Sequence, residues 1–177
     1  MMQHTSLCRR ALDCAVPAYL RLVQGLEALI PLFDLSVRLY LANIFWKGGM
    51  VKLSSWMSTV MLFTMVYDVP VLSPEMAAYL STAVELGGSF LLAIGLAGRW
   101  AALSLFGLNI VAALSYGQLS EAALQEAFYW GILFLYFALH GPGRLSIDAL
   151  LESLIRRRAS TGLGEDELLK RTILHSA

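Results

Sequence analysis

Residues 31–50 of this chain read PLFDLSVRLYLANIFWKGGM, a mostly apolar stretch that nevertheless contains Asp34 and Arg38. About 20 predominantly apolar residues are enough for a helix to cross a bilayer. A charged side chain in hydrocarbon is costly unless it is paired or hydrated, so such residues usually face the interior of a helix bundle. Glu85 lies in the same way in the middle of the apolar stretch 75–96. The sequence therefore predicts a membrane protein with a polar interior.

The composition also indicates a membrane protein. Of the 177 residues, 58% are hydrophobic and 15% are charged, and the mean hydropathy is +0.65. Soluble domains have about 45–50% apolar and about 25% charged residues. The formal net charge is zero, and the sequence shows no basic-aromatic pattern or nucleic-acid-binding motif. No nucleic acid is therefore expected as a partner.

The apolar pattern predicts four membrane-spanning helices, at residues 31–50, 75–96, 99–117 and 123–140. The linkers between the last three are short, and short linkers make neighbouring helices antiparallel. Residues 56–66 are apolar but too few to span a bilayer, so we expect an interfacial or re-entrant helix there, before Pro70 and Pro74. The expected fold class is all-α, a four-helix transmembrane bundle with amphipathic flanking helices.

The chain is expected to have three parts. These are an N-terminal amphipathic segment at 1–30, a four-span membrane domain at 31–148, and an amphipathic helix with a loose cytoplasmic tail at 149–177. The apolar face of the first part consists of Leu7, Ala11, Cys14, Ala15, Ala18 and Leu22. Gly141, Pro142 and Gly143 end the fourth span. Ser146 is placed to cap the helix that follows, and Asp148 falls in its first turn.

The distribution of lysine and arginine predicts the orientation, because cytoplasmic loops of membrane proteins carry an excess of both. With four spans, the arginine-bearing flanks and turns fall on one side, and only Lys47 and Lys52 fall on the other. The arginines that carry this argument are Arg9, Arg10, Arg21, Arg99, Arg144, Arg156, Arg157 and Arg158. We therefore expect a multi-pass protein of the bacterial cytoplasmic membrane with both termini in the cytoplasm.

Several spans carry polar side chains at helical spacing. Asp34 and Arg38 are four residues apart, so they share one face of the helix and can pair. Asn43 and Lys47 lie on roughly the opposite face, and Glu85 lies within an arc of small residues. The candidate pocket and polar-core residues are Asp34, Arg38, Asn43, Lys47, Glu85, Asn109, Glu126, Tyr129, Tyr136 and His140.

Arg38 and Glu85 both lie well away from the ends of their spans. The simplest arrangement that satisfies both charges is a buried ion pair between them, with Asn109 as a neighbour. Such a pair either fixes only the helix register, as buried pairs often do, or lines a functional cavity, as intramembrane ionisable groups often do. His140 is either a hydrogen-bonding residue at a helix end or a proton donor or ligand. No residue is assigned a catalytic or cofactor-binding role.

The histidine, cysteine and methionine patterns bear on cofactors. Haem held by two histidines needs both inside the membrane, and only His140 comes near the bilayer. The sequence has no CxxC pair, zinc-ligand spacing, phosphate-binding loop or dinucleotide motif. Met57, Met61 and Met65 share one helix face, where packing is favoured over a soft-metal site. We expect no haem and no metal, whereas a quinone or another lipid needs only an apolar slot with a few hydrogen-bonding groups.

Three sequence motifs follow one another between residues 35 and 150. They are RLYLANIFWKGGMVK at 38–52, ELGG at 85–88 with GLAGR at 95–99, and GPGRLSID at 141–148. In this order and spacing they resemble the DoxX family of small four-span membrane proteins. The insert YDVPVL at 67–72 is similar to a DoxX branch associated with small copper-binding peptides. The motif residues carried over are Arg38, Lys47, Lys52, Glu85 and Arg99, without a catalytic role.

The DoxX resemblance implies a link to membrane oxidoreductase complexes, because the family is named for a quinol oxidase or thiosulfate:quinone oxidoreductase subunit. The first functional hypothesis is therefore an accessory subunit of a quinone-linked complex, with a pocket lined by Arg38, Glu85, Asn109, Tyr129 and Tyr136. The second is a non-enzymatic membrane partner in metal-peptide handling or stress response. The third is a small proton-coupled transporter. Whether the chain is an enzyme stays open, and if it is, an oxidoreductase subunit is implied. Expected partners are the lipid bilayer and either a membrane or soluble protein or a second copy.

Overall fold

A computed structural model of the chain describes residues 3–67, 69, 72–116 and 120–158. Its helices are α1 (Gln3–Ser54), α2 (Trp56–Met65), α3 (Pro74–Ile94), α4 (Gly98–Ser115) and α5 (Glu121–His140), and residues 147–158 are also helical. Among the described residues, the β-structure is limited to an isolated bridge between Tyr67 and Tyr116. The all-α prediction is therefore confirmed.

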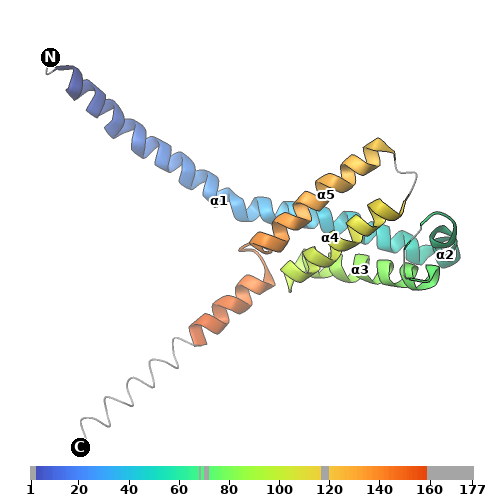
Figure 1. Cartoon of the computed structure of the whole chain (residues 1–177). Helices are drawn as coiled ribbons and strands as arrows, with labels where there is room; N and C mark the ends of the chain where they lie inside the picture. Colours follow the sequence, from blue (N-terminus) through green and yellow to red (C-terminus); the bar gives the residue numbers. More distant parts are fainter. Residues whose placement is uncertain (1–2, 68, 70–71, 117–119, 159–177) are drawn as a thin grey trace, which may run out of the picture.

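Four helical stretches are long and apolar enough to cross a membrane, namely Tyr19–Ser54 within α1 and the whole of α3, α4 and α5. The predicted four-helix transmembrane bundle is thereby confirmed. The spans expected at 75–96, 99–117 and 123–140 each match one helix to within a few residues. The short helix expected at 56–66 is α2, which joins α1 to α3 at the end of the bundle opposite the two termini (Figure 1).

Local capping explains where two of the spans begin. The side chain of Ser73 accepts a hydrogen bond from the backbone N–H of Met76 at 3.3 Å, and Pro74 occupies the first position of α3. Ser120 accepts in the same way from Ala123 at 3.3 Å at the start of α5. Serine caps satisfy N–H groups that have no partner within the helix, and proline is well suited to a first helical position.

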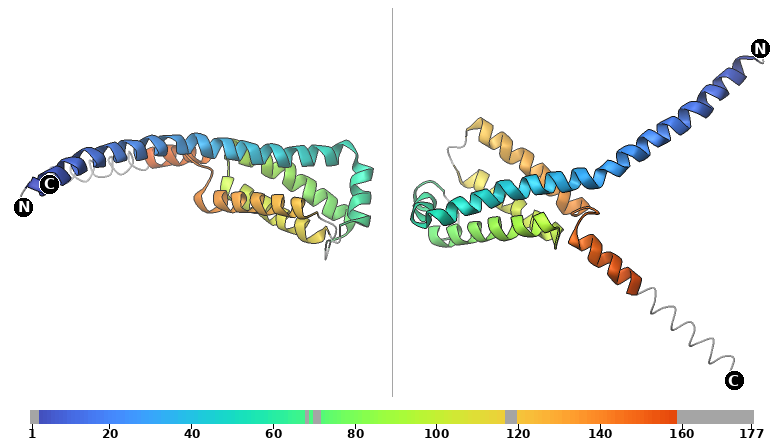
Figure 2. Two further views of the ribbon diagram at one scale, coloured as in Figure 1. Left: turned by 90° about the horizontal axis from the view of Figure 1, so that it is seen from above. Right: turned by 180° about the vertical axis from the view of Figure 1, so that it is seen from behind.

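The helix α1 is longer than the sequence predicted, because it runs unbroken over 52 residues. Proline inside a helix removes a hydrogen bond and usually kinks the chain. Pro17 and Pro31 both lie inside α1, and the helix continues through both of them with a bend where it reaches the bundle (Figures 1 and 2). The division expected between residues 30 and 31 therefore coincides with no break. The apolar stretch of 36 residues extends about 54 Å, beyond the roughly 30 Å of a hydrocarbon core.

The N-terminal half of α1 and the helix at 147–158 both project from the same end of the bundle and diverge from each other (Figures 1 and 2). Most side chains of the predicted N-terminal amphipathic face belong to residues 3–15, and these side chains lie outside the described part. The tail predicted from residue 159 onward also lies outside the described residues. The amphipathic character of the first segment and the loose tail thus stay predictions.

The main core lies where α1, α3, α4 and α5 meet. The ring of Phe45 on α1 packs edge-on against Phe134 at 4.9 Å and against Trp130 at 5.7 Å, which ties the first span to the last. The buried members of this core are Leu41, Phe45, Leu92, Ala101, Ala102, Leu105, Phe134, Phe137 and Ala138. Since every spanning helix contributes to it, this core fixes the relative positions of all four spans.

Small residues let α3 approach its neighbours closely, as is common for helices packed in membranes. A β-carbon added at Gly49 would lie 2.7 Å from Leu86, and one at Gly88 would lie 2.9 Å from Leu105. The arc of small residues predicted on α3 is buried, and its buried members are Ala78, Ser81, Thr82 and Ser89. The small residues thus place α3 between α1 and α4.

Candidate functional site

Arg38 of α1 is one of the most deeply buried side chains of the bundle, with 2% of its surface exposed. Its Nη1 donates a hydrogen bond to the carbonyl oxygen of Pro142, and its Nη2 donates to that of Leu145 at 2.7 Å. Both acceptors belong to residues 141–148, the segment after α5 that we call the clasp. Because a charged donor makes a hydrogen bond stronger, Arg38 fixes the clasp against the first span.

Asp148, the last residue of the clasp, holds the turn between α3 and α4. Its two carboxylate oxygens accept hydrogen bonds from the backbone N–H groups of Ala97 and Gly98, each at 2.8 Å. The helix α4 has no side-chain cap of its own at Ala97. An acid in this position satisfies free N–H groups and complements the helix dipole. Asp148 therefore caps α4 from 50 residues further along the chain.

Gly95 allows the turn to approach Arg38 and the clasp. Its φ is 70°, a conformation that side-chain-bearing residues rarely adopt, and an added β-carbon would lie 2.8 Å from Nη1 of Arg38 and 2.5 Å from Ser146. Its carbonyl oxygen accepts from the N–H of Asp148 at 3.0 Å. The sequence motifs at 38–52, 95–99 and 141–148 thus meet at the end of the bundle nearer the termini.

Asp34 lies on the same buried face of α1 as Arg38 and contacts α5. Its Oδ1 accepts a hydrogen bond from the hydroxyl of Tyr136 at 3.0 Å, and the Tyr136 ring stacks on His140 with the ring centres 4.6 Å apart. The salt bridges among the described residues do not include one between Asp34 and Arg38. The two charges share a face as predicted, but each forms its hydrogen bonds with α5 or the clasp, and Nε of Arg38 is buried without a partner among the described residues.

The predicted ion pair between Arg38 and Glu85 is wrong. Glu85 of α3 instead forms a salt bridge with Lys52 near the end of α1, through Oε1 and Nζ. The two side chains are largely buried, with 19% of Lys52 and 12% of Glu85 exposed. The second carboxylate oxygen of Glu85, Oε2, is buried and has no hydrogen-bond partner within the described part of the chain.

The register of the antiparallel helices α1 and α3 explains the error. Arg38 lies level with Gly95, because its Nη1 is next to the position of a β-carbon there. Glu85 is ten residues earlier on α3, which corresponds to about 15 Å along a helix. Lys52 was placed outside the first span, but α1 continues to Ser54. The long side chain of Lys52 can therefore reach the carboxylate inside the bundle.

The Lys52–Glu85 pair lines a cavity of about 500 Å³, which we call the Lys52–Glu85 cavity. Residues from α3, α4 and the loop after α2 make up most of its wall. The apolar members of that wall include Phe63, Leu72, Leu80, Val84, Leu108, Val111 and Leu114. The wall also carries the hydroxyls of Tyr67, Ser81, Ser104 and Ser115. The cavity is thus an apolar slot with one buried charge pair and a few hydrogen-bonding groups.

Tyr67, which sequence reasoning did not single out as a site residue, lines this cavity and a second one of about 450 Å³ between α4 and α5. Its ring stacks on Phe63 at 4.8 Å and meets Tyr116 edge-on at 5.4 Å. Burial raises the pKa of the Tyr67 phenol, and the nearby negative charge of Glu85 raises it further. The hydroxyl therefore stays protonated at neutral pH and can donate a hydrogen bond.

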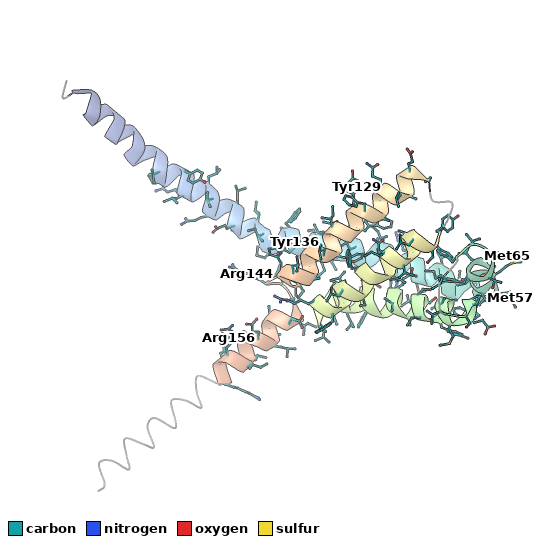
Figure 3. The ribbon with its side chains drawn as sticks, viewed as in Figure 1. Met57, Met65, Tyr129, Tyr136, Arg144 and Arg156 are labelled. Atoms are coloured by element: carbon teal, nitrogen blue, oxygen red, sulfur yellow. The ribbon has the colours of Figure 1, made fainter. Side chains whose placement is uncertain are left out.

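The other predicted site residues do not join the Lys52–Glu85 pair. Asn109 donates a hydrogen bond from Nδ2 to the carbonyl oxygen of Ala127 at 2.7 Å and lines the cavity between α4 and α5, together with Glu126. Tyr129 is 55% exposed and points away from the core (Figure 3). The remaining exposed candidates are Asn43, Lys47 and His140. The ten candidates thus fall into separate groups, and only Glu85 lines the Lys52–Glu85 cavity.

Comparison with known families bears directly on the segment that contains the Lys52–Glu85 pair. Residues 33–118 match the family model of DoxX. Over these residues the chain belongs to the DoxX family. The DoxX match includes Arg38, Lys52, Glu85 and the turn at 95–99, but it ends before α5 and the clasp. No curated protein and no solved structure matches the chain.

The described part of this DoxX protein contains no group of three or more His, Cys, Asp or Glu side chains placed to hold a metal ion. The methionines of α2 do not pack into the bundle, contrary to the interpretation favoured from the sequence. Met57, Met61 and Met65 are 81%, 56% and 73% exposed. Figure 3 shows Met57 and Met65 at the end of the bundle far from the clasp. They form a thioether stripe on the surface of α2.

Proposed function

We propose that this DoxX protein binds a lipid-soluble molecule with a polar ring, of the quinone class, in the Lys52–Glu85 cavity. In this proposal the chain serves as a membrane subunit of a quinone-linked redox complex. The observation that carries it is a buried ion pair whose carboxylate has one unpartnered oxygen, on the wall of an apolar cavity. A buried oxygen without a hydrogen bond is costly, so a ligand that donates to Oε2 gains the most from this site.

The size and chemistry of the cavity support a quinone. Ligand pockets are typically about 300–1,000 Å³, mostly apolar, with a few well-placed polar groups. A quinone ring has carbonyl oxygens that accept hydrogen bonds, and its reduced form has hydroxyls that donate them. Lys52 carries N–H donors beyond the one that Glu85 accepts, and Glu85 keeps Oε2 as an acceptor. The pair therefore offers groups for both forms of the ring.

Filling the cavity is expected to abolish quinone binding while leaving the fold intact. Gly107 lines the cavity, and a β-carbon added there meets nothing within 4 Å. Gly107→Phe should therefore occupy the slot without displacing a neighbour. Titration of the purified protein with decylubiquinone, followed by tryptophan fluorescence, should show saturable binding for the wild type and at least a tenfold lower affinity for Gly107→Phe.

Gly87→Phe is the matched control, because Gly87 lies on α3, has the same free space around its β-carbon, and does not line the cavity. This control should bind decylubiquinone like the wild type. Glu85→Gln removes the charge but keeps the shape, and a charge-assisted hydrogen bond is worth roughly 1.5–3 kcal/mol, so affinity should fall about tenfold or more. Equal affinity in wild type, Gly107→Phe and Glu85→Gln would refute quinone binding at this site.

The exposed methionine stripe favours a second candidate, a membrane partner that handles a metal-carrying peptide. Thioether ligands select soft ions such as Cu(I), and Met57, Met61 and Met65 present three of them on the surface of α2. If this function holds, Cu(I) titrated against a chromophoric chelator should bind the wild type. The triple variant with leucine at these positions should lose that binding. Unchanged Cu(I) binding in the triple variant would exclude the methionine stripe as the Cu(I)-binding site.

A further inference from the structure

A larger cavity of about 750 Å³ lies at the other end of the bundle, between the α3–α4 turn and the clasp. We call it the clasp cavity. Two guanidinium groups line it: Arg99 at the start of α4 and Arg144 within the clasp. His140 and Trp100 line it as well. Figure 3 shows Arg144 at the junction of α5 and the helix at 147–158, where α1 crosses.

The acids that line the clasp cavity are already engaged. Asp148 accepts two backbone hydrogen bonds at the start of α4, and Glu152 accepts hydrogen bonds from Arg156 at 3.1 and 2.7 Å. Among the described residues, neither Arg99 nor Arg144 forms a salt bridge. Arg99 donates a long hydrogen bond of 3.5 Å from Nη2 to the carbonyl oxygen of His140. The carboxylates of Asp148 and Glu152 thus line the same cavity, but neither of them forms an ion pair with Arg99 or Arg144.

The position of the cavity indicates where its ligand comes from. Arg99 is in the first turn of α4, and Arg144 follows α5 by four residues, so both lie where spanning helices end. Spanning helices end at the level of the lipid headgroups. Arginine binds phosphate oxygens with its planar fork of N–H groups. Trp100 is 75% exposed beside them, and tryptophan is typical of the headgroup region.

We infer that the clasp cavity binds the phosphate group of an anionic phospholipid between Arg99 and Arg144. The proposal is independent of quinone binding, because the two cavities share no lining residue. The clasp builds this site, since Arg38 holds the carbonyl groups of Pro142 and Leu145, on either side of Arg144, and Arg144 lines the same cavity as Arg99. Occupancy of the site would join the clasp, the α3–α4 turn and one leaflet of the bilayer.

Native mass spectrometry of the full chain in detergent tests this site. Phosphatidylglycerol and phosphatidylcholine are added in separate titrations to the wild type and to Arg99→Gln/Arg144→Gln. The double variant should lose about tenfold in phosphatidylglycerol affinity, because each guanidinium–phosphate hydrogen bond is charge-assisted. Affinity for phosphatidylcholine should change little. Arg99→Lys/Arg144→Lys keeps both charges and should retain most of the preference for phosphatidylglycerol.

The matched control is Arg21→Gln/Lys47→Gln, which removes the same charge from exposed side chains outside the cavity. It should bind phosphatidylglycerol like the wild type. A third arm adds inorganic phosphate to the wild-type complex, and a lipid site should keep its phosphatidylglycerol at equal phosphate concentration. An equal loss in the control, no loss in Arg99→Gln/Arg144→Gln, or displacement by inorganic phosphate would each overturn the proposal.

Discussion

Arg38→Gln is expected to destabilise the bundle more than any other single substitution of a polar residue. The change removes the charged donor from two hydrogen bonds, to Pro142 and Leu145, and charged hydrogen bonds contribute about 1.5–3 kcal/mol each. The loss should be on the order of 3–5 kcal/mol, and roughly 10 °C in melting temperature for a chain of this size. Thermal unfolding of the detergent-purified protein, followed by size-exclusion chromatography, measures the effect.

Two further variants test whether the stability lost in Arg38→Gln comes from the hydrogen bonds between Arg38 and the clasp. Lys47→Gln changes an exposed cation on the same helix and should leave the melting temperature within about 1–2 °C. Arg38→Lys keeps the charge but lacks the planar fork that reaches two carbonyl oxygens, so it should recover only part of the stability. Full recovery by Arg38→Lys, or no loss in Arg38→Gln, would show that the guanidinium does not hold the clasp.

The second large effect is expected from separating Lys52 and Glu85. Glu85→Leu leaves the largely buried ammonium of Lys52 without its partner, and removing one member of a buried pair costs on the order of 3 kcal/mol. Lys52→Met combined with Glu85→Leu should restore stability to near the wild-type level, because an apolar pair of similar volume is often as stable as the ion pair. Unfolding of the four proteins in this cycle gives the coupling energy.

The double-mutant cycle of Lys52 and Glu85 needs a control cycle with Arg38, the residue that the sequence predicted to pair with Glu85. Arg38→Met combined with Glu85→Leu should show losses that add, since the two side chains have different partners about 15 Å apart along the helix axis. Coupling between Arg38 and Glu85, or additive losses for Lys52 and Glu85, would contradict the structure.

Much of the fold could be predicted from the sequence because the hydrophobic signal is local. Three of the predicted spans and the predicted short helix at 56–66 agree closely with helices of the structure. In each case an apolar run is bounded by glycine, proline or serine residues, so the local sequence marks where the helix begins and ends. The helix that contains the first predicted span, 31–50, extends beyond these bounds at both ends. In the structure, Pro31 lies inside a continuous helix that bends where it reaches the bundle.

The arrangement of the polar groups could not be predicted, because it depends on the register between helices. Helical spacing correctly placed Asp34 and Arg38 on one buried face, but it contains no information on which residue of another helix lies level with them. Asn109 was predicted to lie beside Glu85 for the same reason, but its side chain donates a hydrogen bond to Ala127 of α5.

One long-range contact did leave a signal in the sequence. Ala97 and Gly98 begin α4 without a serine, threonine, aspartate or asparagine cap, which indicates that the cap comes from elsewhere. Asp148 supplies it. The aspartate was predicted to serve its own helix, because a first-turn acid is the common local role. A missing cap in one segment and a spare acid in another together point to such a contact.

The separation of Arg38 from its acceptors has a consequence for biosynthesis. Pro142 follows Arg38 by 104 residues, so at about 5–20 residues per second the ribosome releases these carbonyl groups roughly 5–20 s after Arg38 has emerged. During that interval the insertion machinery, water or lipid phosphates must shelter the guanidinium. The first helix to enter the bilayer is therefore the last to complete its contacts. A nascent chain truncated before the clasp keeps Arg38 without these acceptors, and we expect membrane quality-control proteases to degrade it.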